Sequence, residues 1–424
     1  MKTNSHMFLF LLCFSYSLLP AQTVYRTKVS NPLIRSLQVR VAGQEISEPF
    51  IELSGNEQIE INFDATTHDL QRYAYKIIHC NADWTPSPLL PVEYLNGFQG
   101  LNVDDYAQSR ATITHYTNYR VLLPNDEIQF KVSGNYAVQF FQEDHPDEII
   151  LTACFSVVEP LVSLAGSISS NTDVDFNREH QQLSFSIYAK DFSIPYPQSD
   201  LKIRVYQNNR RDRIVTSIQP TRIAGNQLTY EHIRELIFEA GNEFRRIEFL
   251  TNRYNGMNID KITYHAPYYH VDVMTDELRS GKSYVYDQDQ DGRYFIRCSN
   301  CSDPDTEADY YIVHFRLAAN PLQNGDIYIS GDLFNQTLDE NNRMEYNASG
   351  GYYEKAVLLK GGNYNYQYLY VPKGEQAGQT GPIEGNYYQT ENEYTIAVYY
   401  SPMGARYDRL IGRTTLRNPQ RYIK

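Results

Sequence analysis

Two cysteines separated by two residues are the first candidates for chemistry in this sequence. Cys298 and Cys301 form a Cys-x-x-Cys pair, which elsewhere serves as a redox dithiol at the start of a helix or as half of a four-ligand zinc site. Neither a helical pattern nor a second pair of ligands accompanies them. We therefore predict that Cys298 and Cys301 form a local disulfide or remain inert thiols. Cys80 and Cys154 are either buried single cysteines or a cross-strand pair, and their spacing does not distinguish the two.

An acidic segment resembles the start of a calcium-binding loop. Residues 287–292 read Asp-Gln-Asp-Gln-Asp-Gly, which places carboxylates at positions one, three and five and glycine at position six. Position twelve, however, is Cys298, where the loop needs a bidentate glutamate. The flanking residues 284–286 and 294–296 alternate like strands, so we expect a hairpin closed by Asp-Gly and no metal site.

The standard catalytic motifs are missing from the sequence. Its ten histidines include no His-Glu-x-x-His pair, and there is neither a Gly-x-Ser-x-Gly elbow nor a Gly-x-x-x-x-Gly-Lys-Ser/Thr phosphate loop. His79 and Cys80 are neighbours on a predicted strand, so their side chains point to opposite faces. Paired carboxylates for glycoside hydrolysis have no support in the sequence. We expect no catalytic residue and no cofactor.

Short segments of alternating apolar and polar residues must position whatever site the protein has. Residues 36–41, 58–63 and 201–206 follow this period-two pattern, which is typical of strands with one buried face. The 37 tyrosines and 19 phenylalanines fit the same assignment, because aromatic rings suit half-buried strands. We predict an all-β fold of tandem immunoglobulin-like β-sandwich domains.

Strand and turn patterns divide the chain into five parts. We expect a signal peptide at residues 1–21, a first β-sandwich at 22–160, a second β domain with the projecting hairpin at 161–302, an immunoglobulin-like domain at 303–402 and a basic tail at 403–424. At about 100–150 residues, each of the three middle parts has the size of one sandwich domain.

The first 21 residues have the order of a secretory signal. Lys2 precedes an apolar run at residues 7–14, and Ala21 supplies a small residue for cleavage. Cys13 lies inside the apolar run rather than at its end, which argues against a lipid anchor. We expect an exported protein in a compartment where disulfides are permitted.

Charge is distributed unevenly along the chain. The formal net charge is −13, which argues against bulk attraction to nucleic acid. Residues 403–424 have the opposite sign, because several basic residues face Asp408 alone. The basic residues are Arg406, Arg409, Arg413, Arg417, Arg421 and Lys424. We expect this segment to make an electrostatic contact.

One segment of the predicted last domain resembles a carbohydrate-binding module. Residues 331–335, Gly-Asp-Leu-Phe-Asn, are similar to the early-set modules attached to enzymes that act on glycogen and starch. The resemblance implies an immunoglobulin-like early-set fold and offers carbohydrate binding as an alternative function. Those modules stack a tryptophan on the sugar directly after Phe-Asn, where this chain has Gln336 and Thr337. Alternating tyrosines nearby are better interpreted as one face of a strand than as a sugar platform. They are Tyr364, Tyr366, Tyr368 and Tyr370.

Two longer strings carry a closer resemblance. Residues 79–84, His-Cys-Asn-Ala-Asp-Trp, and residues 93–98, Glu-Tyr-Leu-Asn-Gly-Phe, resemble the hallmark of the plug proteins of the type IX secretion system, a periplasmic family of Gram-negative bacteria. Further matching strings occur in order through nearly the whole mature chain. Within the hallmark, Asn81 and Asp83 suit a turn, and Trp84 either packs into a corner or contacts a partner.

The resemblance implies a function for the whole protein. A plug protein closes the periplasmic mouth of the wide outer-membrane translocon barrel when no cargo occupies it. We therefore predict a non-enzymatic, monomeric plug in the periplasm that binds the translocon barrel, without nucleic acid and without inserting into the membrane. Its predicted partner-binding residues are Trp84, Tyr94, Phe98, Arg406, Arg409 and Arg413.

Overall fold

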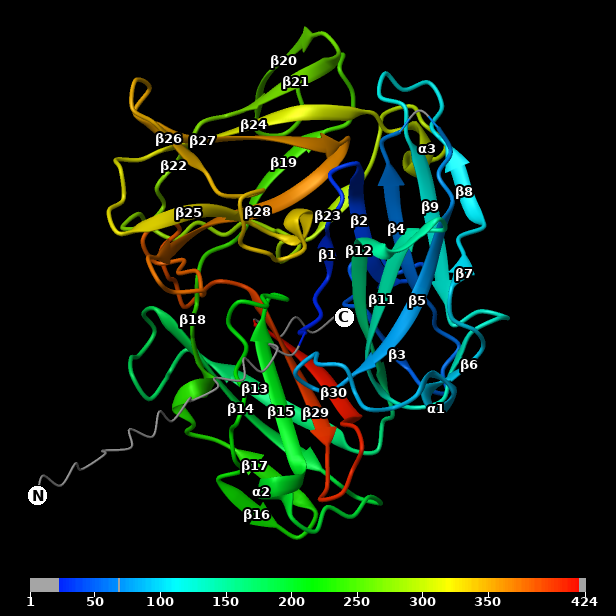
Figure 1. The fold of residues 1–424 in the computed structure, drawn as a ribbon. Coiled ribbons are helices and arrows are strands. Elements are labelled where there is room, and N and C mark those ends of the chain that lie inside the picture. Colours follow the sequence, from blue (N-terminus) through cyan, green and yellow to red (C-terminus); the bar gives the residue numbers. More distant parts are fainter. Residues whose placement is uncertain (1–22, 68, 419–424) are drawn as a thin grey trace, which may run out of the picture.

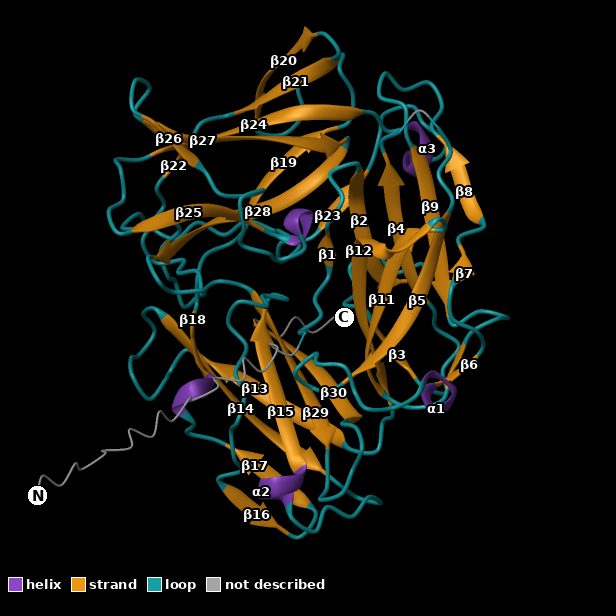
Figure 2. Cartoon of the chain, in the orientation of Figure 1, coloured by secondary structure: helices purple, strands orange, loops and turns teal. Residues whose placement is uncertain are grey.

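Three β lobes make up the protein in a computed structural model that describes residues 23–67 and 69–418. Figure 1 shows the first lobe on the right, the third at the upper left and the second below them. The alternating segments form strands because one face of each packs into the apolar core of its lobe. Strands dominate all three lobes and the helices are short (Figure 2). The predicted all-β fold is confirmed.

The first lobe packs two sheets against a common apolar core. Its elements are β1 (Lys28–Val29), β2 (Ile34–Val41), β3 (Phe50–Glu52), β4 (Ile59–Ala65), β5 (Tyr73–Cys80), α1 (Pro91–Tyr94), β6 (Leu95–Asn96), β7 (Leu101–Asn102), β8 (Asp105–Gln108), β9 (Thr117–Leu123), β10 (Gln129–Phe130), β11 (Gly134–Gln142) and β12 (His145–Val158). One sheet has the order β1-β12-β11-β5-β7, with β3 parallel to β12, and the other has the order β2-β4-β9-β8. A short pair, β10-β6, stands apart from both.

Two separate stretches of the chain form the second lobe. Its elements are β13 (Ser163–Ser169), β14 (His180–Tyr188), α2 (Pro197–Asp200), β15 (Leu201–Gln207), β16 (Arg222–Ala224), β17 (Gln227–Tyr230), η1 (Arg234–Leu236), β18 (Ile237–Glu239), β29 (Asn392–Tyr400) and β30 (Arg409–Asn418). One sheet has the order β13-β14-β17-β16, with β18 paired to β14, and the other has the order β15-β29-β30.

The third lobe is inserted between these two stretches. Its elements are β19 (Arg245–Phe249), β20 (Ile259–His265), β21 (Tyr268–Val273), β22 (Asp276–Glu277), β23 (Tyr294–Ile296), β24 (Tyr310–Ala318), β25 (Gly325–Ser330), η2 (Asp332–Phe334), β26 (Glu345–Asn347), β27 (Tyr352–Lys360) and β28 (Gly362–Pro372). The segment between β23 and β24 carries α3 (Pro304–Glu307), which lies against β9 of the first lobe. The sheets have the orders β19-β28-β23, with β25 also on β28, and β20-β21-β24-β27-β26, with β22 on β24.

This grouping differs from the predicted continuous domains. Strand β15 pairs with β29, with Leu201 opposite Tyr400, and Ile396 and Ile411 are buried in the core of the second lobe. The expected boundary at residue 402 therefore falls inside the second lobe, and the expected basic tail contains strand β30. An alternating pattern shows that a segment is a strand, but the sheet that it joins depends on which core buries its apolar face.

The predicted hairpin around the acidic segment is not formed. Strand β23 pairs with β28 instead, and residues 284–286 are not in a strand. Side chains of the acidic segment bond to the backbone: Asp289 accepts hydrogen bonds from the N–H groups of Phe244 and Asp291. Such side-chain bonds compete with strand pairing, which explains the loop.

The cysteines differ in their environments. Cys298 and Cys301 are joined by a disulfide with an S–S distance of 1.97 Å. Cys80 and Cys154 are free and buried, on strands β5 and β12, which are separated by β11. Among the described residues, no three His, Cys, Asp or Glu side chains are grouped so that they could hold a metal ion.

Some sequence predictions concern segments outside the described residues. The expected signal peptide at residues 1–21 is one, and Arg421 and Lys424 of the basic segment are others. Within residues 23–67 and 69–418, no helix is long and apolar enough to cross a membrane.

Candidate functional site

A tight turn after β5 places Trp84. The N–H of Asn81 donates to the carbonyl of Thr85 and the N–H of Trp84 donates to the carbonyl of Asn81, both at 2.9 Å. Asp83 Oδ1 accepts from the N–H and the hydroxyl of Thr85 at 3.0 and 2.6 Å. The predicted turn role of Asn81 and Asp83 is confirmed. Trp84 has a φ of 66°, in the left-handed region that bulky residues rarely adopt.

His79, the first residue of the hallmark, has a structural role. Its Nδ1 lies 2.8 Å from Ser87 Oγ and its Nε2 lies 3.1 Å from the carbonyl oxygen of Ser133. Burial lowers the pKa of His79 to about 4, so the ring is neutral at pH 7. Gly134 lies beside it with a φ of 141°, and a Cβ there would be 2.4 Å from His79 Nε2. Burial also raises the pKa of the Cys80 thiol, so this is not a Cys-His catalytic pair.

Three large apolar side chains around α1 are exposed on the first lobe. Phe98 is 82 % exposed, Val92 70 % and Leu90 62 %. We call Leu90, Val92 and Phe98 the apolar tip. It belongs to the segment that carries α1 and β6, at the lower right of Figure 1. Of the predicted partner-binding residues, Phe98 is therefore well placed to contact another molecule.

Buried neighbours anchor the apolar tip. Tyr94 is buried, and its hydroxyl donates to the carbonyl of Ile77 at 2.9 Å, so Tyr94 supports the tip rather than facing solvent. Gly97 has a φ of 136°, and a Cβ there would lie 2.1 Å from the carbonyl oxygen of Glu127. Only glycine fits this close approach without a shift of the backbone, so Gly97 fixes where Phe98 leaves the surface.

The predicted partner-binding arginines form ion pairs within the chain. The pairs are Arg406 with Glu93, Arg409 with Glu159 and Arg413 with Glu48, at 2.5, 2.8 and 3.2 Å. Each joins the segment around β30 to a residue in or directly after the first lobe. The arginines therefore tie the second lobe to the first, and Arg406 does so next to the apolar tip.

Buried polar contacts also connect every pair of lobes. They are Lys360 with Asp64 at 2.6 Å, Arg293 with Glu393, and the N–H of Ala82 with Asp408 Oδ2 at 3.0 Å. Lys360 and Asp64 are 1 % and 0 % exposed. Because buried ion pairs are favourable only at close and specific geometry, these contacts hold the three lobes as one body.

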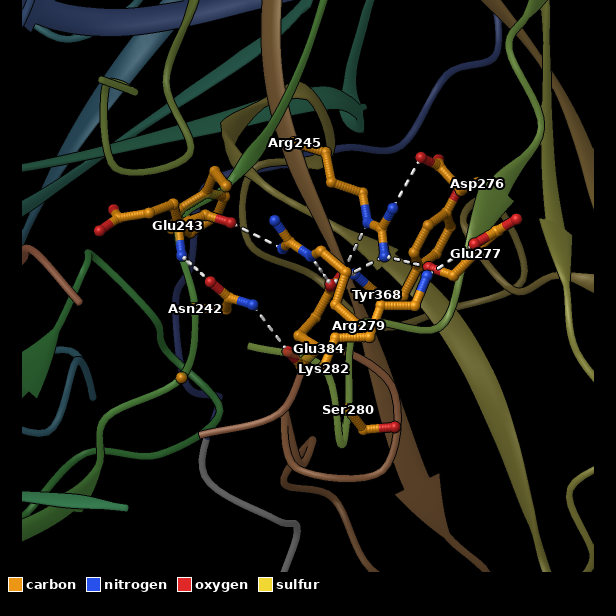
Figure 3. A network of polar contacts seen from close by, with 12 residues as sticks. Asn242, Glu243, Arg245, Asp276, Glu277, Arg279, Ser280, Lys282, Tyr368 and Glu384 are labelled. Carbon is orange, nitrogen blue, oxygen red and sulfur yellow. Dashed lines mark hydrogen bonds and ion pairs between the residues drawn. The ribbon is translucent and has the colours of Figure 1, made fainter. Parts of the chain in front are cut away.

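A charged network lies inside the third lobe (Figure 3). Arg245 on β19 is 2.7 Å from Asp276 and 3.0 Å from Glu384, and Arg279 Nε is 2.7 Å from Glu384. The Tyr368 hydroxyl donates to Asp276 at 2.7 Å. Burial alone would raise the pKa of Glu384, but Arg245 and Arg279 overcome this and hold the pKa below its ordinary value. Each charge has a partner, so the network stabilises the lobe and leaves no group poised to react.

Glu243 borders this network and is less well satisfied. The Tyr284 hydroxyl and the N–H of Glu391 donate to its Oε1, and its Oε2 has no hydrogen-bond partner among the described residues. Burial raises the pKa of Glu243 to about 7. Its backbone carbonyl accepts from Arg279 at 2.6 Å, a contact drawn in Figure 3. No nucleophile is bonded to Glu243, so its contacts indicate a structural carboxyl.

The alternating tyrosines of β28 lie in the core. Tyr364, Tyr366 and Tyr368 are buried together, which confirms that they form one face of a strand. Tyr370 is half-buried, and its hydroxyl donates to the carbonyl of Gln323 at 2.7 Å. None of these four rings is free to form an exposed platform for a sugar.

The first lobe contains the region that identifies the protein. Residues 34–159 match the family described as the type 9 secretion system plug protein first domain. The chain belongs to the plug protein family of the type 9 secretion system. It is also similar to a solved structure, the crystal structure of a hypothetical protein from Parabacteroides merdae ATCC 43184, with 63 % identity, a TM-score of 0.93 and coverage of 94 % of this chain and 100 % of the other. A search among curated proteins found no match.

The family match covers part of the candidate surface. The Trp84 turn and the apolar tip lie inside the matched plug domain, whereas the arginines around β30 lie outside it. Sequence reasoning missed Lys360 and Asp64, which meet although they are 296 positions apart. The one signal for Asp64 is a charged residue within a strand pattern, and nothing local indicates its partner.

Proposed function

We propose that this plug family member seals the periplasmic opening of the type IX translocon barrel when no cargo is present, without catalysing a reaction. The observation that carries the proposal is the apolar tip in the matched plug domain. Large apolar side chains that stay in solvent, while buried neighbours fix their position, are typical of a contact surface for another protein.

The connection between the lobes supports the same function. A plug for an opening that passes folded proteins has to be a body at least as wide, and a domain of about 100 residues has a radius of gyration of about 13 Å. Three such lobes joined by buried ion pairs supply more width than one domain. Lobes on flexible linkers would not block the opening reliably.

The surroundings of the apolar tip suit a reversible contact. Arg406 and Glu93 form a partly exposed ion pair beside it, and the Arg406 Nη2 also donates to the carbonyl of Pro88 at 3.1 Å. A small apolar centre with a polar rim is typical of interfaces that form and dissociate. We place the protein in the periplasm as a monomer that is held at the outer membrane through the barrel.

Affinity purification of the barrel from its own membranes tests the proposal. Cells carry either the wild-type protein, Phe98→Asp, or the control Phe176→Asp, which changes a residue 66 % exposed on the second lobe. We expect the wild type and the control to co-purify with the cargo-free barrel and to be absent from the cargo-loaded barrel. Phe98→Asp should reduce recovery at least about 30-fold, as expected for a central aromatic contact.

Outer-membrane permeability gives an independent measurement. Cells with Phe98→Asp, or without the gene, should admit large molecules that wild-type and Phe176→Asp cells exclude, while secretion continues in part. Equal recovery of Phe98→Asp and wild type, or stoichiometric occupancy of one barrel by cargo and this protein together, would contradict the proposal.

A further inference from the structure

A cavity of about 710 Å³ lies where the three lobes meet. Its walls include Trp84 and Cys154 from the first lobe, Tyr206 and Arg211 from the second, and Tyr294 and Asp332 from the third. Cavities of this size at the junction of domains, with aromatic walls and a few polar groups, are typical of sites for small organic molecules.

Arg211 lines this cavity without a direct ion pair. Its guanidinium carbon lies 4.6 Å from the centre of the Tyr206 ring and 6.0 Å from that of Trp84. It forms no ion pair or side-chain hydrogen bond with any residue that the structure describes. Glu48, a nearby carboxylate, forms an ion pair with Arg413 and accepts a hydrogen bond from the hydroxyl of Thr395. A guanidinium has five N–H donors, and that of the half-buried Arg211 donates to no described side chain. Arg211 is therefore available to an anion from outside the chain.

Tyr206 lines the same cavity and carries a hydroxyl that no described residue satisfies. Its side chain is 2 % exposed, and its hydroxyl has no hydrogen-bond partner among the described residues. A buried hydroxyl without a partner is unfavourable, and most such groups in proteins are satisfied. Burial raises the pKa of Tyr206, so the hydroxyl keeps its proton and donates.

Two acidic residues in the cavity walls accept hydrogen bonds from neighbouring side chains, whereas two arginines in the walls form no ion pair. Asp83 accepts two hydrogen bonds from Thr85, and Asp332 accepts one from Gln336 at 2.9 Å. Arg204, like Arg211, forms no ion pair with a described residue. Carboxylates at the rim, such as the exposed Glu375, stand farther toward solvent. Arg204 and Arg211 are therefore groups of the walls that can attract an anion.

Trp84 gives the cavity an apolar wall at the cost of an unusual backbone. Its φ of 66° persists because the hydrogen bonds of the turn at residues 81–85 hold it there. Residues held in sparsely populated backbone regions cluster at ligand sites and switches, where the strained geometry positions a side chain. Here it positions the indole ring against Arg211.

We propose that the cavity binds a small organic carboxylate, with its oxygens on Arg211 and the Tyr206 hydroxyl and its apolar body against Trp84. A planar guanidinium fork matches a carboxylate in two parallel hydrogen bonds. The aromatic walls favour an anion that carries an apolar body over a bare inorganic ion. This inference does not rest on the plug function, and a bound ligand would link the first lobe to the second by touching Trp84 of one and Arg211 and Tyr206 of the other.

The single tryptophan makes the cavity directly observable. Trp84 is the only tryptophan in the sequence, so the fluorescence of the purified mature protein, excited at a wavelength that tyrosine does not absorb, reports on this wall alone. The probe is 4-nitrobenzoate, which quenches indole fluorescence, and 4-nitrobenzamide is the matched neutral compound. We expect saturable quenching by the carboxylate and only linear, collisional quenching by the amide.

Variants assign the effect to the two donors. Arg211→Gln should raise the concentration of 4-nitrobenzoate that gives half-maximal quenching about tenfold or more, because it removes a charge-assisted hydrogen bond. Tyr206→Phe should raise this half-saturating concentration severalfold, because it removes the hydroxyl donor. The control Arg222→Gln changes an exposed arginine on β16 and should leave it unchanged. Circular dichroism and thermal unfolding of each variant check that the fold is retained.

Three outcomes would overturn the proposal. One is equal quenching by the carboxylate and the amide. Another is unchanged saturable quenching in a folded Arg211→Gln variant. The third is displacement of 4-nitrobenzoate by inorganic phosphate as effectively as by benzoate, which would show that the cavity takes an inorganic ion instead.

Discussion

The charged network of the third lobe and the cavity between the lobes contain arginines in opposite situations. Arg245 has carboxylates on two sides, Asp276 and Glu384, within 3.0 Å. Arg211 has aromatic rings at 4.6 and 6.0 Å and no carboxylate at ion-pair distance among the described residues. Charges with partners in the chain stabilise the fold, whereas a charge without one is left for a ligand.

Two neighbouring residues repeat this contrast. Arg210 is buried, pairs with Asp212 at 2.6 Å and donates to the carbonyl of Gly378 at 2.5 Å. Arg211 follows it directly and has neither kind of contact. The same residue type, one position apart, therefore serves the fold in one case and faces the cavity in the other.

Removing Arg245 should have the largest effect on stability. Arg245→Met leaves Asp276 and Glu384 buried with one fewer cation, which we expect to lower the free energy of unfolding by about 3–5 kcal/mol. Urea unfolding followed by circular dichroism measures the loss. Exposed Arg222→Met is the control and should change it by less than about 0.5 kcal/mol. If Arg245→Met lowers the free energy of unfolding by less than about 1 kcal/mol, the expected loss of about 3–5 kcal/mol is wrong for this network.

Removing Arg210 should have the next largest effect. Arg210→Met leaves the Asp212 carboxylate and the Gly378 carbonyl without their donor, so we expect a loss of about 3 kcal/mol in the free energy of unfolding. The same urea experiment measures it. Stability equal to that of the wild type would mean that solvent or another residue replaces the donor.

Glu243 should make the stability depend on pH. Burial raises its pKa in the folded protein to about 7, so the folded state holds a proton that the unfolded state releases near pH 4.5. The stabilisation is present below pH 4.5 and is lost as the pH rises through 7. Between these limits the free energy of unfolding should fall by about 3 kcal/mol because of Glu243, and Glu243→Gln should remove this part of the decline.

Unfolding midpoints measured from pH 4.5 to pH 8 check this prediction. Burial also raises the pKa of Asp289, to about 6, so Glu243→Gln should flatten the profile without abolishing its slope. Glu231→Gln, at an exposed position, should keep the wild-type profile. A Glu243→Gln profile that is parallel to the wild type would argue against a buried, protonated Glu243.

Replacing Arg211 should have the smallest effect on stability. Arg211→Met orphans no carboxylate, so we expect the free energy of unfolding to change by less than about 0.5 kcal/mol, while saturable quenching of Trp84 is lost. A loss of stability comparable to that of Arg210→Met would remove the contrast between the two arginines and indicate a structural role for Arg211.

Local patterns in the sequence predicted much of this protein correctly. Period-two alternation predicted the strands, because the side chains of a strand alternate between core and solvent wherever it lies. Asn81 and Asp83 predicted the turn at Trp84, because both residue types favour turns, and the Asp83 side chain accepts a hydrogen bond from the N–H of Thr85 two residues away. The hallmark strings predicted the family because each string is contiguous in the sequence and can be recognised without the tertiary structure.

The sequence determined which segments are strands and turns, and the tertiary structure alone decided which segments share a core and which charges have partners. Strands β15 and β29 pair across nearly 200 residues, so continuous domains were the wrong expectation. Arg210 and Arg211 cannot be told apart by type or by neighbours. Their difference arises because the ion-pair partner of a side chain is set by the packing of distant strands, and no local pattern records that packing.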